Sequence, residues 1–327
     1  MPSFPVSDHG DGARFFNPAG RLQARSFFAL PRWWWQRLVL REGSHWPRTM
    51  PPPQKPVLPE NLSAGQLAVT FIGHSTFLLQ LPGLNILTDP VFATRAGPLG
   101  WLGPKRVRPP ALRLAELPRI HVVLLSHNHY DHLDLAALRW LSRQHRSVVV
   151  TTLGNKNWLA ARGVADVVEL DWWQSHKARA GLGITCTPAQ HFAARAPWDR
   201  CRTLWGGFML RAATGRIFFA GDTGWAPHFA EIKTRLGAPA LALLPIGAYE
   251  PRWFMEPVHM NPDEAVRAHL ALGARQSIGM HFSTFQLTNE DIAEPLAALA
   301  VARAAHGVEP AAFTTLDFGE TRLFDLP

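Results

Sequence analysis

Four side chains that can bind a metal ion lie within six residues of one another: His127, His129, Asp131 and His132. They follow an apolar segment, 120–125, whose length and β-branched content predict a buried strand. Imidazole nitrogens and carboxylate oxygens are ligands that zinc accepts, and a rigid strand end fixes where they point. His127 and His129 leave an extended chain on the same side, and the other two follow a turn later. The spacing therefore predicts two metal ions at one loop.

Three further candidate ligands stand directly after other predicted strands. His191 follows segment 182–187, and it is placed as a third ligand of the first ion. Asp222 follows segment 216–220, and its carboxylate could bridge both ions. His281 follows the last predicted strand, 277–280. The pattern of a strand followed by a ligand repeats along the chain, so we expect these residues to converge on one centre.

Short apolar segments and helical segments alternate between these residues. Segments 67–72, 76–81 and 84–88 are separated by turns and predict an antiparallel meander. Later segments alternate between the two types, which predicts an α/β fold. The expected strands are 147–151, 167–170, 205–210 and 240–244, and the expected helices are 135–145, 155–162, 261–272 and 288–305.

Composition sets the class of protein. The chain has 327 residues, 47% hydrophobic and 18% charged, which is enough to bury a sizeable core. The net charge of +8 favours anionic partners. The cysteines, Cys186 and Cys201, form no disulfide framework. No run of eighteen apolar residues and no signal-peptide core occur, so we expect a cytoplasmic protein, peripheral on the inner face of a membrane if it binds one.

Residues 1–66 differ from the rest of the chain. Many prolines predict an extended arm, and a folded domain is expected over 67–327. Tryptophans Trp33, Trp34 and Trp35 lie among arginines, a combination that suits an anionic membrane surface. The alternatives are that these rings pack on the domain or on another subunit, as in a homodimer.

The array at 127–132 resembles that of the metallo-β-lactamase superfamily. Segment 73–76 and Thr88-Asp89-Pro90 resemble the opening strands of the superfamily fold. The longer string 127–134 and Gly103-Pro104-Lys105-Arg106 are similar to the branch that contains N-acylphosphatidylethanolamine-hydrolysing phospholipase D. The resemblance covers about residues 67–320 and implies an αββα four-layer sandwich. It assigns ligands to each ion: His127, His129 and His191 on one, Asp131, His132 and His281 on the other, and Asp222 between them.

The resemblance also implies roles around the metals. Asp89 would orient a ligand histidine by accepting its other N–H, and His74 would be either structural or part of the site lining. Asp131 is expected to act in catalysis as well as in metal binding, and His259 to donate a hydrogen bond or a proton near the scissile phosphate. The expected substrate-binding residues are Lys105, Arg106, Arg108 and Tyr249.

The expected reaction is hydrolysis with two Zn²⁺ per chain, with Mn²⁺ or Fe²⁺ as alternatives. Diiron relatives carry glutamate where this chain has His129, which favours zinc hydrolysis over redox chemistry. A metal-bridging hydroxide would attack the phosphorus of a phospholipid, releasing N-acylethanolamine and leaving phosphatidic acid. Alternatives are a sugar-phosphate lactonase of a neighbouring branch, or a basic nucleic-acid-processing protein. The second is disfavoured because no recognised nucleic-acid motif occurs.

Overall fold

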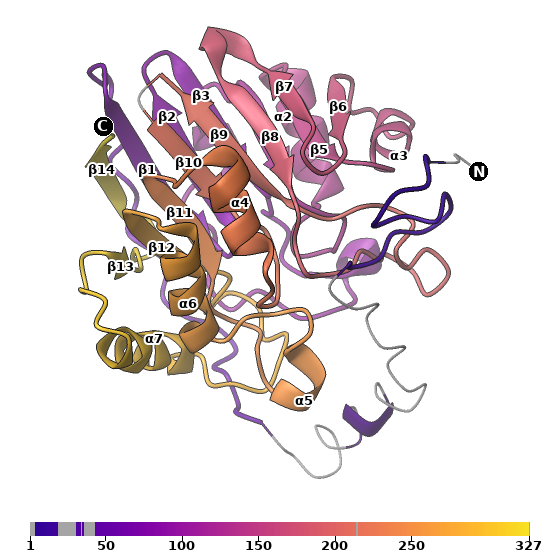
Figure 1. The fold of residues 1–327 in the computed structure, drawn as a ribbon, viewed down its shortest axis with the longest axis vertical. Coiled ribbons are helices and arrows are strands. Elements are labelled where there is room, and N and C mark those ends of the chain that lie inside the picture. Colours follow the sequence, from indigo (N-terminus) through magenta and orange to yellow (C-terminus); the bar gives the residue numbers. More distant parts are fainter. Residues whose placement is uncertain (1–3, 19–30, 34, 36–42, 214, 327) are drawn as a thin grey trace.

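Two seven-stranded sheets form the centre of the computed structural model, which describes residues 4–18, 31–33, 35, 43–213 and 215–326. The sheets are stacked, and helices cover their outer faces (Figure 1). The strand orders are β14-β1-β2-β3-β4-β5-β6 and β13-β12-β11-β10-β9-β8-β7. This arrangement is the predicted αββα sandwich.

The first sheet combines an antiparallel and a parallel part. Its antiparallel strands are β14 (Thr321–Asp325), β1 (Gln66–Gly73), β2 (Thr76–Leu81) and β3 (Leu84–Thr88). Parallel pairing continues through β4 (Val122–Leu125), β5 (Val148–Thr152) and β6 (Val167–Leu170). Helices α2 (Leu135–Gln144) and α3 (Lys156–Ala160) pack on the outer face through Leu138, Leu141 and Leu159.

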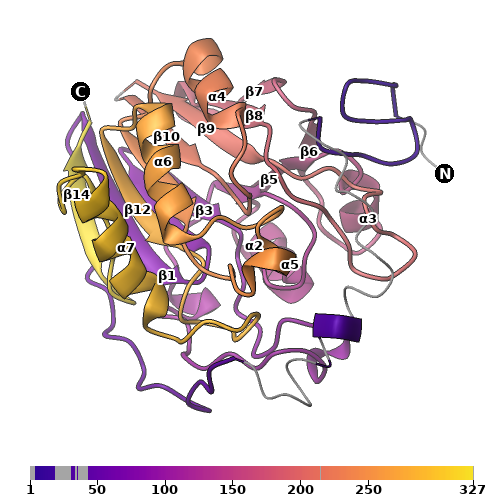
Figure 2. The same ribbon diagram turned by 60° about the horizontal axis from the view of Figure 1, so that its bottom comes forward.

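The second sheet has the same mixed character. Antiparallel pairing joins β7 (Ser175–Lys177), β8 (Gly183–Thr187), β9 (Gly207–Ala212) and β10 (Gly215–Phe219). The parallel strands that follow are β11 (Leu241–Pro245), β12 (Gln276–Met280) and β13 (Phe313–Thr314). Outside them lie α4 (His228–Leu236), α6 (Pro262–Leu272) and α7 (Glu294–Ala305), whereas the short α5 (Arg252–Met255) stands away from the sheet (Figure 2).

Alternating side chains divide the strands between two cores. In β4, Val122 and Leu124 face the core between the sheets, and Val123 and Leu125 face the helices. The same alternation holds in β2, where Phe77 and Leu79 are buried between the sheets. Because successive residues of a strand point to opposite faces, strands with both faces covered need continuous apolar runs. That requirement explains why the runs were recognisable in the sequence.

Short elements outside the sheets were harder to predict. The strands β7, β13 and β14 and the helices α4 and α5 were not predicted. The helix expected over 288–305 begins only at Glu294. Residues before it are held in another way: Glu290 accepts hydrogen bonds from the Ala248 amide at 2.6 Å and from the Thr288 hydroxyl at 2.7 Å. These tertiary contacts override the helical pattern of the segment.

The described parts of the N-terminal arm lie on the domain. Phe15 is part of the core between the sheets, and Trp33 stacks on Phe254 with 5.5 Å between ring centroids. Trp35 is 60% exposed, and Trp34 lies outside the described residues. The domain division at residue 66 and the membrane role of the arm stay predictions.

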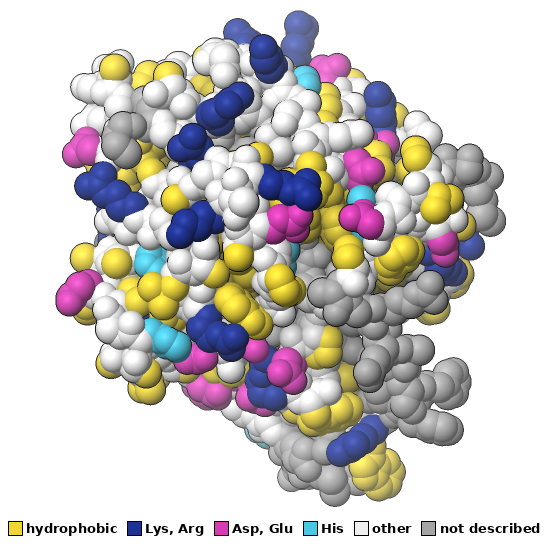
Figure 3. All heavy atoms as spheres, viewed as in Figure 1, with side chains coloured by type: hydrophobic (Ala, Val, Ile, Leu, Met, Phe, Trp, Pro, Cys, Tyr) yellow, Lys and Arg dark blue, Asp and Glu magenta, His cyan; other side chains and the backbone are white. Residues whose placement is uncertain are grey.

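Two surface properties bear on the expected partners. On the face shown in Figure 3, lysine and arginine side chains lie interspersed with acidic and apolar ones. None of the helices in the described part of the chain has the length and apolar content that a bilayer-spanning segment needs.

Candidate metal centre

The predicted ligands come together at one edge of the two sheets. The loop after β4 supplies the motif residues, and the segments after β8, β10 and β12 supply the other three. His74, from the β1–β2 turn, and His259, from the loop before α6, join them. Parallel strands bring their carboxyl ends to the same edge, and the two sheets face each other there. The stacking of the two sheets therefore brings the candidate ligands of both sheets into one cluster.

Asp222 lies at the centre of this cluster. Its Oδ2 atom is 3.0 Å from Nε2 of His132 and 3.2 Å from Nε2 of His281. The Nε2 atoms of three further histidines lie 3.8 to 3.9 Å from the same oxygen: His127, His191 and His259. One carboxylate surrounded by five imidazoles is well placed to bridge two cations.

Two smaller groups of ligand atoms lie on either side of Asp222. In one, His127 Nε2 is 2.9 Å and His191 Nε2 is 3.3 Å from His129 Nδ1. In the other, Asp131 Oδ2 lies 3.4 Å from His281 Nε2 and 3.5 Å from His132 Nε2. The two groups match the two ligand sets that the resemblance implies.

The cluster is chemically suited to metal ions. The ring atoms His132 Nε2 and His281 Nε2 and the carboxylate oxygen Asp222 Oδ1 are enclosed without any hydrogen-bond partner among the described residues. Leaving several polar atoms buried and unpaired is costly, and a bound cation would satisfy them together. Nitrogen and carboxylate oxygen donors are the set that zinc and related divalent ions accept. The residues therefore fit the group that the motif implies.

Burial and charge set the protonation of these groups. Burial lowers the pKa of His129 to about 4 and that of His191 to about 3. Burial alone would raise the pKa values of Asp131 and Asp222, but His132 and the other surrounding histidines together outweigh it and hold both pKa values well below their usual range. Neutral imidazoles and ionised carboxylates are the forms that bind metal.

The pKa values of two histidines, His281 and His132, are raised instead of lowered. Burial alone would lower the pKa of His281, but the negative charge of Asp222 and contact with Asp131 raise it to about 9. The pKa of His132 is also raised, because the charges of Asp222, Asp131 and Asp89 outweigh its burial. The carboxylates therefore attract positive charge at this point of the centre, which a cation would supply.

Asp89 supports the motif loop from the end of β3. Its Oδ2 atom accepts hydrogen bonds from His132 Nδ1 at 2.6 Å and from the Ser126 hydroxyl at 2.6 Å, and its Oδ1 accepts one from the Ser126 amide at 2.8 Å. Ser126 also contacts His127 Nδ1 at 2.9 Å. Fixing the far nitrogen of an imidazole orients the near nitrogen toward a metal. This arrangement agrees with the role expected of Asp89.

His191 is supported from two distant segments. Its Nδ1 lies 2.9 Å from the carbonyl oxygen of Val258. Its main chain is bound by Asn17 of the arm: Asn17 Nδ2 donates to the His191 carbonyl at 2.8 Å, and Asn17 Oδ1 accepts from the His191 amide at 3.3 Å and from Trp205 Nε1 at 3.1 Å. Asn17 is only 1% exposed. This contact was not predicted, because no motif links an asparagine in a proline-rich arm to a residue 174 positions later.

Close backbone approach brings the two sheets' loops together. Gly221, immediately before Asp222, has φ +61°, and a Cβ there would lie 2.6 Å from Cβ of Ser126. Only glycine fits both conditions. His74, Asp89 and His281 also have positive φ values, of 59°, 29° and 64°. Non-glycine residues in this conformation are strained and concentrate at functional sites.

His74 and His259 border the centre. His74 Nε2 lies 3.1 Å from Asp131 Oδ2, and its ring is 4.0 Å from that of His281. His259 is 7% exposed, and its ring lies 5.0 Å from that of His191. The carbonyl of His259 is held by Arg252 Nη1 at 3.0 Å. His74 is thus within reach of a metal, and His259 stands at the edge of the cluster.

The predicted substrate-binding residues are dispersed. Arg106 is 7% exposed and donates to the carbonyls of Val91 and Ala93, at 2.6 and 3.1 Å. Tyr249 is 4% exposed, and its hydroxyl donates to Glu294 at 2.8 Å. Lys105 is exposed, and Arg108 lines a separate cavity. Substrate contacts by these four residues stay predictions, and the structure gives two of them internal partners.

Comparison with known families identifies the fold and the chemistry. Residues 84–282 match the model of a β-lactamase superfamily domain. The chain is 39% identical, over 87% of its length and 85% of the relative's, to N-acyl-phosphatidylethanolamine-hydrolyzing phospholipase D 1 of Caenorhabditis elegans. The chain belongs to the metallo-β-lactamase superfamily, in the N-acylphosphatidylethanolamine phospholipase D-like branch. The predicted family is thereby confirmed.

Two other relatives support this assignment to the superfamily. The mitochondrial N-acyl-phosphatidylethanolamine-hydrolyzing phospholipase D of Saccharomyces cerevisiae is 35% identical over 78% of the chain, which spans 56% of that protein. A UPF0173 metal-dependent hydrolase of Solibacter usitatus is 30% identical over 67% of the chain and 86% of its own length. This superfamily member is a metal-dependent hydrolase, as predicted.

Solved structures show the same fold. Igni18, a metallo hydrolase of Ignicoccus hospitalis, superposes with a TM-score of 0.60, 22% identity and coverage of 80% of this chain and all of its own. An isothiocyanate hydrolase from Delia radicum gut bacteria gives a TM-score of 0.63 at 21% identity, covering 79% of this chain and 99% of its own. At these identities the likeness concerns the fold alone.

Proposed function

We propose that this chain is a dizinc phosphodiesterase of the N-acylphosphatidylethanolamine phospholipase D type. The observation that carries the proposal is the cluster of seven predicted ligands, Asp222 and six others, in a chain 39% identical to an N-acyl-phosphatidylethanolamine-hydrolyzing phospholipase D. The proposed substrate is an N-acylated phosphatidylethanolamine, and the proposed products are N-acylethanolamine and phosphatidic acid. Two Zn²⁺ ions are the proposed cofactors.

The predicted ligands would hold metal ions at two positions. The group His127, His129 and His191 would hold one ion, the group Asp131, His132 and His281 the other, and Asp222 would contact both. Divalent cations there would lower the pKa of a bound water to about 7 and neutralise charge on phosphoryl oxygens. Asp89 and Ser126 keep the imidazoles oriented, so the centre is organised before substrate enters.

His259 is the proposed hydrogen-bond or proton donor to a phosphoryl or leaving-group oxygen. Its Nδ1 atom is buried and has no hydrogen-bond partner among the described residues, and its Nε2 is 3.9 Å from Asp222. Arg252 holds the main chain of His259 in place. A positioned imidazole at the edge of the cluster has the geometry that such a role needs.

The experiment that tests the proposal compares products. Purified metal-loaded protein is offered N-acylphosphatidylethanolamine in mixed micelles, and its products are separated by mass. N-acylethanolamine and phosphatidic acid are expected in equal amounts. Release of fatty acid or diacylglycerol, or turnover only of a lactone offered in parallel, would contradict the assignment.

A metal-site variant and elemental analysis complete this test. Asp222→Asn removes one charge from the cluster and is expected to lower both metal content and turnover. Elemental analysis of the wild-type protein is expected to give two zinc ions per chain. Association with an anionic membrane and formation of a homodimer stay predictions, and they can be checked by liposome sedimentation and by mass in solution.

A further inference from the structure

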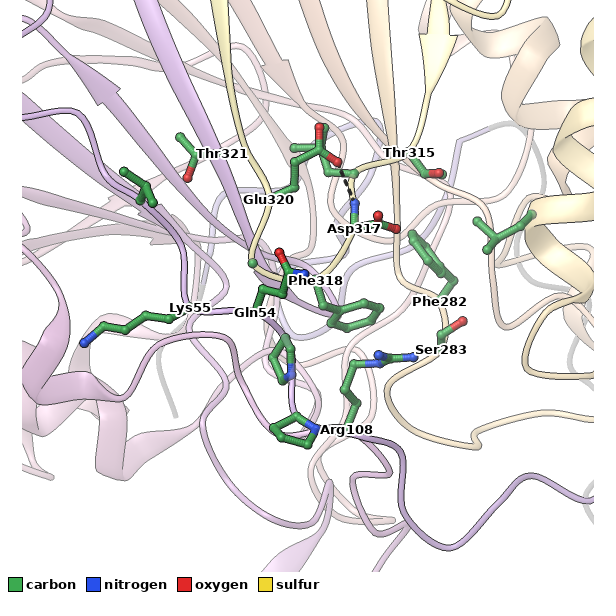
Figure 4. A pocket seen from close by; sticks show the side chains of 16 residues that line it. Gln54, Lys55, Arg108, Phe282, Ser283, Thr315, Asp317, Phe318, Glu320 and Thr321 are labelled. Carbon is green, nitrogen blue, oxygen red and sulfur yellow. Dashed lines mark hydrogen bonds between the residues drawn. The ribbon is translucent and has the colours of Figure 1, made fainter.

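A second cavity, of about 620 Å³, lies apart from the metal centre. Its walls are formed by residues 52–55 and 57 of the arm, Arg108, the Phe282-Ser283 pair, Leu296 of α7 and the C-terminal turn 315–321 (Figure 4). Its lining, all of it in the described part of the chain, includes none of the candidate metal ligands. The volume is within the range of small-molecule sites in proteins.

The walls of this cavity are fixed by close packing. Gly319 has φ +89°, and a Cβ there would collide with the carbonyl oxygen of Gln54. The Gly319 amide donates to the Phe71 carbonyl at 2.8 Å, which ties the C-terminal turn to β1. The arm therefore crosses the turn at a point where only glycine allows contact. The cavity exists because the arm and the C-terminal turn meet in this way.

Arg108 provides the unusual chemistry of the cavity. Its guanidinium lies over the ring of Phe318, 4.5 Å from the centroid, and Figure 4 shows it reaching toward Ser283. Its Nε atom is enclosed without a hydrogen-bond partner among the described residues, and the negative charge of Asp317 attracts the guanidinium. By contrast, the nearby Arg106 guanidinium is bound by two carbonyls. An arginine remains charged in proteins and carries five donors, so a partner is expected from outside the chain.

We propose that this cavity binds a small organic anion, with its carboxylate or phosphate on Arg108 and an apolar body on Phe318. A planar guanidinium matches such oxyanions through paired hydrogen bonds. Leu296 and Phe282 supply further apolar wall. The carboxylate of Asp317, which attracts the Arg108 guanidinium, lines the side formed by the C-terminal turn and disfavours a second negative group beside it. Glu320, on the same side, is paired with Arg322 at 2.6 Å. The preferred ligand therefore has a single anionic end.

The cavity is separate from the metal centre, but two of its wall segments continue into segments that carry members of the cluster. Phe282 and Ser283 directly follow His281, and the ring of Phe318 lies against Gly73, the neighbour of His74. Ser283 has φ +49°, so this wall is a constrained piece of backbone. A bound anion would contact segments that carry two members of the cluster. Binding itself can be measured without turnover, so its outcome is independent of the proposed reaction.

Calorimetric titration of the metal-loaded full-length protein tests the site. Benzoate represents a carboxylate with an apolar body, and inorganic phosphate represents an oxyanion without one. We expect saturable binding of benzoate, weakened at least tenfold in Arg108→Gln and partly restored in Arg108→Lys. Because both anions can also bind at the metal centre, the comparison uses the part of the binding that Arg108→Gln removes. Weaker Arg108-dependent binding of phosphate than of benzoate would support the apolar wall, and stronger Arg108-dependent binding of phosphate would contradict it.

Two controls separate this site from the metal centre and from general charge. Arg119→Gln removes the same charge from an exposed position and is expected to bind benzoate as the wild type does. Asp222→Asn perturbs the metal centre and is expected to retain the Arg108-dependent binding. Equal binding by wild type and Arg108→Gln would overturn the proposal, and so would the lack of wild-type binding up to about 10 mM benzoate.

Discussion

The two halves of the candidate metal centre are supported in different ways. The motif loop after β4 is held by near neighbours: Ser126 contacts His127, and Asp89, directly after the adjacent strand β3, contacts His132. His191 instead relies on Val258, 67 residues away, and on Asn17, 174 residues away. The first half is therefore organised by one sheet, and the second half depends on the arm and on the long loop before α6. We expect the two halves to respond differently to substitution.

The largest expected effect concerns chemistry carried by the second half. His259→Gln removes an ionisable donor but no member of the two predicted ligand sets, and we expect turnover to fall by about 10²-fold or more with metal content unchanged. Steady-state kinetics and elemental analysis measure the two quantities. Loss of metal in this variant would make His259 a ligand, and unchanged turnover would remove it from the reaction.

Support of the first half is tested by Asp89→Asn. The buried carboxylate accepts three hydrogen bonds, two from Ser126 and one from His132. An asparagine has a single acceptor oxygen, and its NH₂ group cannot accept, so it cannot accept all three. We expect metal affinity or activity to fall by roughly 10- to 100-fold. Metal titration measures the loss, and Asp166→Asn, at an exposed position, is the matched control. Wild-type metal affinity in Asp89→Asn would show that the motif loop keeps its conformation without the hydrogen bonds to Asp89.

Support of the second half is tested by Asn17→Ala. This change leaves the His191 carbonyl, its amide and Trp205 Nε1 without the asparagine, and we expect roughly tenfold weaker binding at the ion held by His191. The absorption spectrum of Co²⁺-substituted protein reports on that position directly. Asn61→Ala, at an exposed asparagine of the same arm, should bind Co²⁺ as the wild type does. An equal loss of Co²⁺ affinity at both metal positions would mean that Asn17 supports the whole fold.

The smallest expected effect is a pH dependence of the arm. His9 is stacked on Trp172 at 4.3 Å and contacts Asp171 at 2.7 Å and Asp8 at 2.5 Å. Burial alone would lower the pKa of His9, but hydrogen bonds with the two carboxylates raise it above 6.5. A raised folded pKa means that the stabilisation is complete below pH 6.5 and is lost as pH rises through the folded value. Residues 4–18 should thus hold less tightly in alkaline solution.

Hydrogen exchange of residues 4–18 measures this effect. Exchange is expected to be faster at about pH 9 than at about pH 6 after correction for the intrinsic rate, and His9→Gln should abolish the difference. If the pH dependence survives in His9→Gln, another group controls the arm. Because Asn17 lies in the same segment, the experiment also shows whether arm attachment and His191 support are linked.

Much of this protein is determined by local sequence. The runs 67–72, 76–81 and 84–88 became strands within one residue of their predicted bounds, because strands buried on both faces must be continuously apolar. The motif at 127–132 follows its strand directly, so its position and donor types were readable without coordinates. The same holds for His191, Asp222 and His281, each placed after a strand.

Only the tertiary structure could place the supports. Asn17 beside His191, Arg108 in its own cavity and Glu290 on the loop that precedes His259 arise from contacts across the chain, and no periodicity or spacing encodes them. The physical reason is that ligand type and strand formation depend on neighbouring residues, whereas orientation of a side chain depends on whatever packs against it. Sequence thus determined which atoms could bind metal, and folding determined what holds them.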